Sequence, residues 1–266
     1  MHNGDTGAAV ATLQRQLNDA GFKLTVDGWF GLSTEQALIA FQRRANLVAD
    51  GIAGPKTIAA LTSRDRDHRL LSEYDLEAAA IRLGIPVAAI KAVNLVESRG
   101  PGFGVNGKPV ILYERHVAYR LLAEAELEPD IFGKKFPNLI NPKRGGYAGG
   151  SAEWSRLSSA RQIMPVEIAD AACSWGQYQI MGYHWQLLGY DSIEQFVAAM
   201  HRSEADQLDA FCRYIEAAPA IHKAIKAKKW ATFASLYNGP AYKDNLYDVK
   251  LARAFERFTP SEQAAA

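Results

Sequence analysis

Hydrophobic positions along most of the chain recur at the spacing of amphipathic helices. Val10, Leu13 and Leu17 share one helical face near the start of the chain. Beyond residue 72 the same periodicity predicts helices at 74–83, 86–98, 115–127, 152–162, 165–173, 192–217, 219–228 and 242–257. An alternating patch around an Asn-Gly turn predicts a hairpin with strands at 103–105 and 109–112. The predicted fold is therefore mainly α, with a small β-hairpin.

The first sixty residues contain an internal repeat. Asp27-Gly28-Trp29-Phe30-Gly31 matches Asp50-Gly51-Ile52-Ala53-Gly54, 23 residues further on. Each copy is typical of a turn that leads into a helix. Ser33 and Gln36 resemble a capping box, and Pro55 suits the first position of a helix. The repeat predicts a small three-helix unit.

A charged segment without periodicity, residues 62–71, predicts a linker between two domains. We expect a first domain at residues 1–64 and a second at residues 72–260. Within the second domain, the Gly-, Pro-, Lys- and Asn-rich stretch 128–150 predicts a loop that is longer than a simple connection requires.

Composition and charge exclude several classes of protein. Apolar residues make up 48% of the chain and charged residues 22%, a balance typical of globular proteins. The net charge of +1 provides no general attraction to nucleic acid or to an anionic membrane. No stretch approaches about 18 continuous apolar residues, so no membrane span is expected. The first residues lack the basic and apolar regions of a secretory signal. Cys173 and Cys212 are expected to be buried thiols, although a disulfide between them stays open.

Glu97 is the residue whose position is chemically unusual. The helix at 86–98 places it on the same face as Ile90 and Val93. Burial and the negative end of the helix dipole would both raise the pKa of its carboxyl group. The following Arg99-Gly100-Pro101-Gly102 would end the helix and open space beside it. A carboxylic acid that stays protonated near neutral pH can protonate the leaving oxygen of a glycosidic bond. The alternative is an exposed glutamate at a frayed helix end.

Three motifs occur in an order that resembles a known family. Glu97-Ser98, the run Ser174-Trp175-Gly176-Gln177-Tyr178-Gln179-Ile180-Met181, and Leu236-Tyr237-Asn238-Gly239 resemble the Glu-Ser, Gly-x-x-Gln and Tyr-Asn motifs of goose-type lysozymes and soluble lytic transglycosylases. The stretch Ile111-Leu112-Tyr113-Glu114-Arg115-His116 is similar to phage endolysin N-acetylmuramidases of the lysozyme-like fold. The N-terminal repeat resembles the peptidoglycan-binding domain that accompanies such enzymes. Together these resemblances cover nearly the whole chain.

The resemblance implies a role for each matching residue. Glu97 matches the acid/base, and Gln179 matches a glutamine that lines the sugar groove. Tyr237 and Asn238 match a pair that faces the acid and contacts saccharide, and Tyr178 could supply an apolar face. Amide and phenol groups provide the donors and acceptors that a sugar needs. Taken alone, Gln179 also fits a surface polar residue, and Tyr237 a core aromatic with a satisfied hydroxyl.

The chain departs from the family pattern in two places. Gly176 lies 79 positions after Glu97, a longer gap than transglycosylases have, so an insertion or an extra helical layer is expected at 115–170. Met181 stands where goose-type enzymes place an aspartate that positions water. Glu114 is the candidate second carboxylate, and its alternative role is an ion pair with Arg115 or another base.

Asp27 and Asp50, in the two repeat loops, are candidate contacts for glycan or peptide stem. Both also fit a role confined to turn formation, because Asp and Gly are favoured in turns for backbone reasons alone. The histidines show no ligand spacing with cysteine or acidic residues, so no metal and no cofactor are expected.

The resemblance implies a bacteriolytic, antimicrobial enzyme that cleaves the β-1,4 bond between N-acetylmuramic acid and N-acetylglucosamine. If Glu114 activates water, the reaction is hydrolysis; if the 6-hydroxyl of the sugar attacks instead, it is lytic transglycosylation with a 1,6-anhydro product. A third possibility is a wall-binding virion protein without activity. The expected partners are glycan strands and peptide stems. We expect a monomer that is made in a host cytoplasm and acts on the wall in the periplasm after release.

Overall fold

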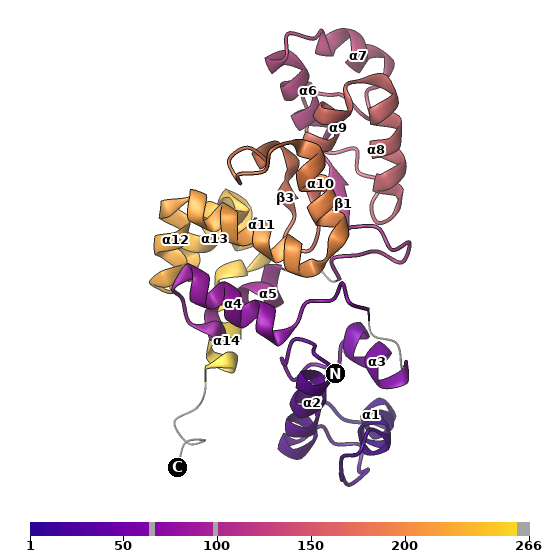
Figure 1. Ribbon diagram of the computed structural model, residues 1–266, viewed down its shortest axis with the longest axis vertical. Helices are drawn as coiled ribbons and strands as arrows, with labels where there is room; N and C mark the ends of the chain where they lie inside the picture. The colour runs from indigo at the N-terminus through magenta and orange to yellow at the C-terminus, as the bar shows by residue number, and fades with distance from the viewer. Residues whose placement is uncertain (64–66, 98–100, 260–266) are drawn as a thin grey trace. The chain divides into compact units, whose positions relative to one another are not determined.

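The computed structural model describes residues 1–63, 67–97 and 101–259, most of which are helical. Two compact units are present (Figure 1): the first comprises Met1–Ala92 and Val249–Ala266, and the second Val93–Asp248. The boundary at Ala92 lies within a helix, whereas the linker was predicted at 62–71, a segment that lies partly outside the described residues. The division by function at 1–64 and 72–260 stays a prediction.

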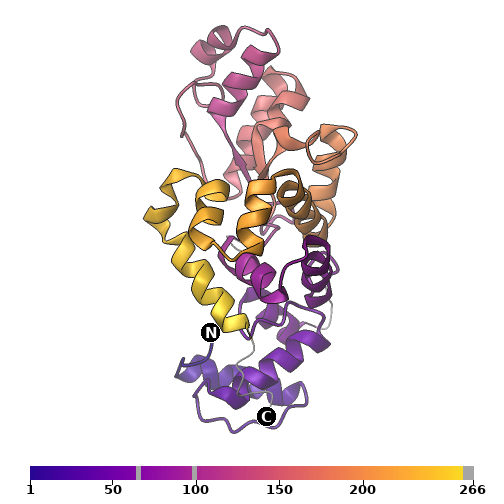
Figure 2. The same ribbon diagram turned by 90° about the vertical axis from the view of Figure 1, so that its left-hand side faces the viewer.

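The predicted three-helix unit is present near the N-terminus (Figure 2). It consists of α1 (Ala8–Asp19), α2 (Leu32–Arg44) and α3 (Pro55–Thr62). The apolar face of α1 enters a core with Phe30 and Leu38. Pro55 occupies the first turn of α3 as predicted. The capping box predicted at Ser33 is wrong, because α2 already begins after Gly31 and no side chain caps it.

A buried glutamine organises the first repeat loop. The Nε2 group of Gln14 donates to Asp27 Oδ1 at 2.8 Å, to the Trp29 carbonyl at 3.0 Å and to Thr34 Oγ1 at 3.2 Å. Its Oε1 accepts the amide of Gly28 at 3.0 Å. The Gln14 amide is therefore satisfied by the loop that it supports.

The second repeat loop uses the same arrangement around a second buried glutamine. The Nε2 group of Gln42 donates to Asp50 Oδ1 at 2.7 Å, to the Ile52 carbonyl at 3.1 Å and to Thr57 Oγ1 at 3.2 Å. Its Oε1 accepts the amide of Gly51 at 3.0 Å. The two aspartates thus both contribute to turn formation, in equivalent ways.

The first unit also contains α4 (Glu73–Leu83), the start of α5 (Val87–Glu97) and most of α14 (Tyr247–Phe258). Ser72 and Asp75 form a capping box at the start of α4, which ends at Gly84 as predicted. Among the described residues, no single helix has the length and apolar character needed to cross a membrane. The helices α4 and α5, which are bent by 116° relative to each other, pass the test when they are taken together. They do so by length and composition alone.

The second unit contains a three-stranded antiparallel sheet in the order β1 (Ile111–Tyr113), β2 (Cys173–Trp175), β3 (Ile180–Met181). The predicted hairpin is present only as a single bridge between Phe103 and Pro109. Residues 111–113 pair with β2, whose first residue was predicted to be helical. Strands of two or three buried residues show no period, so their sequence does not separate them from a buried helix.

The helices of the second unit mostly lie where the periodicity predicts them. They are α6 (Arg115–Glu124), α7 (Pro129–Lys135), α8 (Ala152–Ile163), α9 (Val166–Ala171), α10 (Ile193–Arg202), α11 (Glu204–Ala217), α12 (Pro219–Lys226) and α13 (Trp230–Asn238). The single helix predicted at 192–217 is wrong, because Ser203 is extended and its hydroxyl caps α11. The helix predicted at 242–257 begins instead as a 3-10 turn, Pro240–Asn245. Both α7 and α13 were missed.

The segment expected as an extra helical layer contains α6 to α9 (Figure 1), and a buried carboxylate joins it to the sheet. Oε1 of Glu153 accepts the amides of Ala148 at 2.7 Å and Gly149 at 2.9 Å. Oε2 accepts the amide of Tyr113 at 3.2 Å and Nη1 of Arg156 at 2.7 Å. Burial alone would raise the pKa of Glu153, but these donors outweigh it and the pKa is lowered.

Both cysteines are buried thiols and not a disulfide, as expected. Cys173 lies on β2 and Cys212 on α11. Burial raises the pKa of the Cys173 thiol well above its usual range, so this side chain contributes to the core as a small apolar group.

Candidate active site

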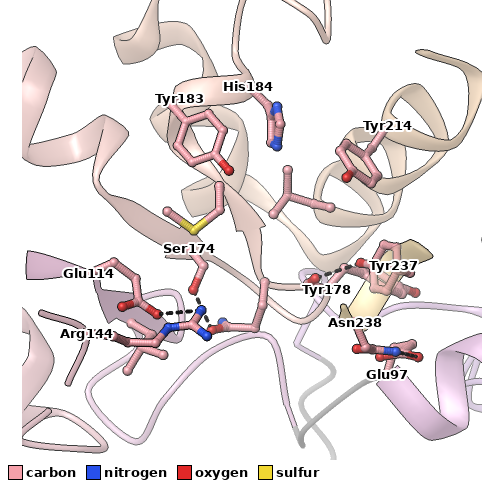
Figure 3. A pocket seen from close by; sticks show the side chains of 14 residues that line it. Glu97, Glu114, Arg144, Ser174, Tyr178, Tyr183, His184, Tyr214, Tyr237 and Asn238 are labelled. Atoms are coloured by element: carbon pink, nitrogen blue, oxygen red, sulfur yellow. Dashed lines mark hydrogen bonds and ion pairs between the residues drawn. The ribbon is translucent and has the colours of Figure 1, made fainter. Parts of the chain in front are cut away.

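A cavity of about 300 Å³ in the second unit gathers most of the predicted site residues (Figure 3). Glu97 and Asn238 lie on one side of it, and Glu114 and Arg144 on the other. The residues that line it are Glu97, Leu112, Glu114, Arg144, Ser174, Tyr178, Gln179, Ile180, Met181, Tyr183, His184, Tyr214, Tyr237 and Asn238. Six of the eight predicted site residues are in this set. Asp27 and Asp50 belong to the first unit and do not line this cavity.

Glu97 is the last residue of α5, on the apolar face that periodicity predicts. Ile90 and Val93 are fully buried, and Glu97 is only 7% exposed. Nδ2 of Asn238 donates to Oε1 of Glu97 at 2.9 Å. The alternative of an exposed glutamate is therefore wrong. Ser98 and the first part of the predicted helix stop lie outside the described residues.

Helix α13 brings Tyr237 and Asn238 to the cavity and ends at Gly239, whose φ is +82°. The Tyr237 hydroxyl donates to the carbonyl of Tyr178 at 2.9 Å, and its ring stacks on Phe233. Burial, followed by the charge of Glu97, raises the pKa of Tyr237 well above its usual value. Its hydroxyl therefore stays protonated. Tyr237 has the satisfied hydroxyl of a core aromatic and also lines the cavity.

The turn between β2 and β3 carries Tyr178 and Gln179. Gln179 has a φ of +52°, and its side chain is fixed locally: Oε1 accepts from Ser174 Oγ at 2.8 Å, and Nε2 donates to the Gly176 carbonyl at 2.8 Å. The Tyr178 hydroxyl donates to Asn94 Oδ1 at 2.9 Å. Both side chains are therefore held in place at the cavity wall before any ligand binds.

Glu114 immediately precedes α6 and is 5% exposed. The hydroxyl of Tyr147 lies 2.8 Å and 3.0 Å from its two oxygens. His116 Nδ1 lies at 3.1 Å and Arg144 Nη2 at 3.8 Å. The partner suggested by the sequence, Arg115, instead donates to backbone carbonyls. Glu114 therefore has basic neighbours and still lines the cavity.

Sequence reasoning missed several groups at the cavity, including Arg144, Tyr183, His184 and Tyr214. The ring of His184 lies 4.3 Å from Tyr183 and 5.1 Å from Tyr214, centroid to centroid. Burial lowers the pKa of His184, so the imidazole is neutral near pH 7. Arg144 and Tyr147 lie in the segment predicted as a loop, which has no periodicity that could single them out.

The cavity combines a buried carboxylate, a second carboxylate and several amide and phenol groups. A carboxyl group of this set can protonate one oxygen of a polar ligand while the amide and phenol groups bind the hydroxyl groups of that ligand. Among the described residues, no group of three or more His, Cys, Asp or Glu side chains could hold a metal ion. The chemistry available to these side chains is acid–base catalysis on a saccharide-like ligand.

Curated relatives match only part of the chain. N-acetylmuramoyl-L-alanine amidase CwlM of Mycobacterium tuberculosis is 41% identical over 107 residues, which are 40% of this chain and 22% of that protein. The zinc D-Ala-D-Ala carboxypeptidase of Streptomyces albus G is 42% identical over 60 residues, 21% of this chain and 24% of that protein. The chain thus spans about a quarter or less of the length of these relatives.

A solved structure and two family models extend the comparison to the whole chain. The crystal structure of the Burkholderia AP3 phage endolysin matches with a TM-score of 0.94 and 53% identity, over 98% of this chain and 99% of that one. The peptidoglycan binding domain model matches residues 6–61, which contain the repeat. The N-acetylmuramidase model matches residues 86–259 and so covers the whole cavity. Since this match spans well over half of the sequence, the chain belongs to the N-acetylmuramidase family.

Proposed function

We propose that the protein is an endolysin that binds peptidoglycan through residues 1–64 and hydrolyses the β-1,4 bond between N-acetylmuramic acid and N-acetylglucosamine. The observation that carries this proposal is the buried carboxyl group of Glu97, held by Asn238 in a cavity lined with amides and phenols. The similarity to a phage endolysin over nearly the full length supports the same conclusion. Its site of action is the cell wall of the host, reached after release from the cytoplasm.

In this mechanism Glu97 protonates the oxygen of the departing sugar. Asn238 fixes the orientation of the Glu97 carboxyl group, because the side-chain amide of Asn238 donates a hydrogen bond to one of its two oxygens. Glu114, on the other side of the cavity, takes a proton from the attacking water. Gln179 and Tyr178 form part of the wall against which the glycan lies, and their local hydrogen bonds fix this wall in advance.

Lytic transglycosylation is the second candidate, favoured by two observations at the cavity, one at Glu114 and one at Met181. The Tyr147 hydroxyl is within hydrogen-bond distance of both of its oxygens, which competes with a bound water. Met181, which also lines the cavity, provides no carboxylate. In this reaction Glu97 first protonates the leaving oxygen as the glycosidic bond breaks. The resulting Glu97 carboxylate then takes the proton of the 6-hydroxyl of the muramic acid residue as that oxygen bonds to its own anomeric carbon, and no external water enters.

Mass spectrometry of the fragments released from purified sacculi tests both candidates. Hydrolysis leaves a reducing muramic acid end, which borohydride converts to the alcohol. Transglycosylation leaves a 1,6-anhydro end that is lighter by one water molecule and resists borohydride. If no fragments form and permeabilised Gram-negative cells keep their turbidity, the protein is a wall-binding component without activity.

A further inference from the structure

The two repeat loops share one hydrogen-bond scaffold but have different surroundings. Asp27 is exposed, and its bonds from Gln14 and the Trp29 amide lower its pKa. Asp50 is half-buried, and its burial raises its pKa. Because the internal bonds are equivalent, this difference must come from what packs on the outside of each loop.

Other parts of the first unit cover the second loop. Arg257 of α14 donates to the Asp50 carbonyl at 3.1 Å and lies 3.6 Å from Glu35. Glu73 of α4 accepts the amide of Ala49 at 3.0 Å and pairs with a lysine of α5. The backbone at Ala49 and Asp50 is therefore engaged in packing within the protein.

The first loop instead borders a cavity of about 230 Å³. Trp29 is 62% exposed at its edge, and Leu32 is 64% exposed beside it. The counterpart of Trp29 in the second loop is Ile52, which has no flat ring. The residues that line the cavity are Gln14, Lys23, Leu24, Thr25, Asp27, Trp29, Gly31, Leu32, Ser33 and Thr34.

The side chains around this cavity suit a sugar better than a peptide stem. An exposed indole offers a flat apolar face on which the C–H face of a pyranose can lie. Thr25, Ser33 and Asp27 provide hydroxyl and carboxylate groups for the sugar hydroxyls. The hydrogen bonds that fix Asp27 in the loop both use Oδ1. A peptide stem has no pyranose face to lie on the indole, and this contact distinguishes the two ligands.

We propose that the first loop alone binds an N-acetylated sugar of the glycan strand, with Trp29 as the stacking platform and Asp27 as an acceptor. The second loop, with the same scaffold, serves instead as an attachment point for α4 and α14. This inference rests on the wall-binding role proposed above. The inference assigns wall binding to the first of the two repeat loops, although both loops have similar sequences.

The repeat supplies a matched pair of variants for the test. In full-length protein that carries Glu97→Gln, Trp29→Ala should weaken co-sedimentation with purified sacculi by about 10-fold or more, as loss of a central aromatic contact implies. Ile52→Ala should stay within about 2-fold of the parent. Thermal melting confirms that both variants are folded. Equal losses, or no loss with Trp29→Ala, would overturn the assignment to the first loop.

A second measurement identifies the ligand. The indole N–H signal of Trp29, assigned in an NMR spectrum by its loss in Trp29→Phe, should move when chitohexaose is added and move less in Asp27→Asn. If the signal does not move with chitohexaose but moves with peptide stems released by an amidase, the assignment of a saccharide ligand is overturned. Neither readout depends on bond cleavage. An inactive wild-type enzyme would therefore refute the proposed reaction without affecting this inference.

Discussion

The side-chain amide of Asn238 donates to Oε1 of Glu97 at 2.9 Å and joins residues that lie 141 positions apart in the sequence. Each is the last residue of its helix, α5 and α13 respectively. The direction of the buried carboxyl group therefore depends on where α13 ends, and Gly239 with its positive φ defines that end.

Asn238→Ala should lower kcat by roughly 10- to 100-fold. The bond from Asn238 strengthens as Glu97 gives up its proton and becomes a carboxylate, and hydrogen bonds to charged groups contribute about 1.5–3 kcal/mol. The lost bond orients the acid and does not form the core, so the melting temperature should change little. Turnover of soluble glycan fragments and thermal melting measure the two effects. A variant with wild-type kcat would show that the contact does not assist catalysis.

Glu97→Gln should reduce the lysis rate by at least about 100-fold, the contribution expected of a general acid. The amide has the shape of the carboxyl group but cannot donate a proton with comparable acidity. Folding should be retained, because the amide, like the protonated acid, buries no charge. The turbidity of permeabilised cells is the measurement, and a folded variant with near-normal lysis would exclude Glu97 as the acid.

Glu114→Gln and Tyr147→Phe separate the two proposed reactions. If Glu114 is the base for water, its replacement should cost about 100-fold in rate. Tyr147→Phe leaves the Glu114 carboxylate in place and removes a donor that competes with the attacking water, so the rate should change by less than about 10-fold. Fragment release followed by mass spectrometry provides both rate and product. A nearly active Glu114→Gln enzyme with anhydro products would make Glu114 structural.

Gly176→Ala should destabilise the second unit by about 2–4 kcal/mol. A Cβ at Gly176, where φ is +71°, would lie 2.5 Å from Cδ of the buried Gln207. Gly149→Ala is the matched control: its φ is +77°, and a Cβ would meet nothing within 4 Å, so only about 1–2 kcal/mol of backbone strain is added. Denaturant unfolding measures both, and equal losses would contradict the steric explanation.

Asp50→Asn should alter the pH dependence of stability in the acid range. Burial raises the Asp50 pKa above its ordinary 3.8, so the folded protein binds this proton more tightly than the unfolded chain does. The contribution of Asp50 to the free energy of unfolding therefore falls as pH rises from below 3.8 through the raised pKa. The melting temperature of the variant, relative to wild type, should increase across that interval.

The same comparison for Asp27→Asn should have the opposite sign. The pKa of Asp27 is lowered, so its stabilising contribution is present above 3.8 and is lost as pH falls through the lowered value. The melting temperature of this variant, relative to wild type, should decrease as pH rises. Parallel curves for the two variants would show that the loops have equivalent surroundings.

Features with a local cause could be predicted from the sequence. Glu97 was identified because three positions of one amphipathic helix share a face, and Pro55 because proline suits a first helical turn. The buried Gln14 and Gln42 could have been found in the same way, since each is a polar residue among the buried positions of its helix. Helical periodicity was therefore sufficient to predict most of the helices of the fold.

Features with a tertiary cause could not be predicted. The strand partner of residues 111–113 lies some sixty residues further on, and pairing of three buried residues has no sequence pattern of its own. Helix α13 is short and its Leu236 is exposed, which weakens the amphipathic pattern. Tyr147 reaches Glu114 because the backbone beside it is bonded to Glu153, and no local propensity encodes that contact.

The bonds of Glu153 also hold the glycine-rich segment 145–150 in place. Four of its residues are glycines with positive φ, a composition usually associated with rapid loop motion. Yet lifting this segment from Glu114 requires the amides of Ala148 and Gly149 to leave a carboxylate that is 0% exposed. That opening leaves Oε1 of a buried carboxylate without donors, while Oε2 keeps the Tyr113 amide and Arg156. We therefore expect the loss of these two bonds, and not the freedom of the glycines, to limit how fast the segment opens.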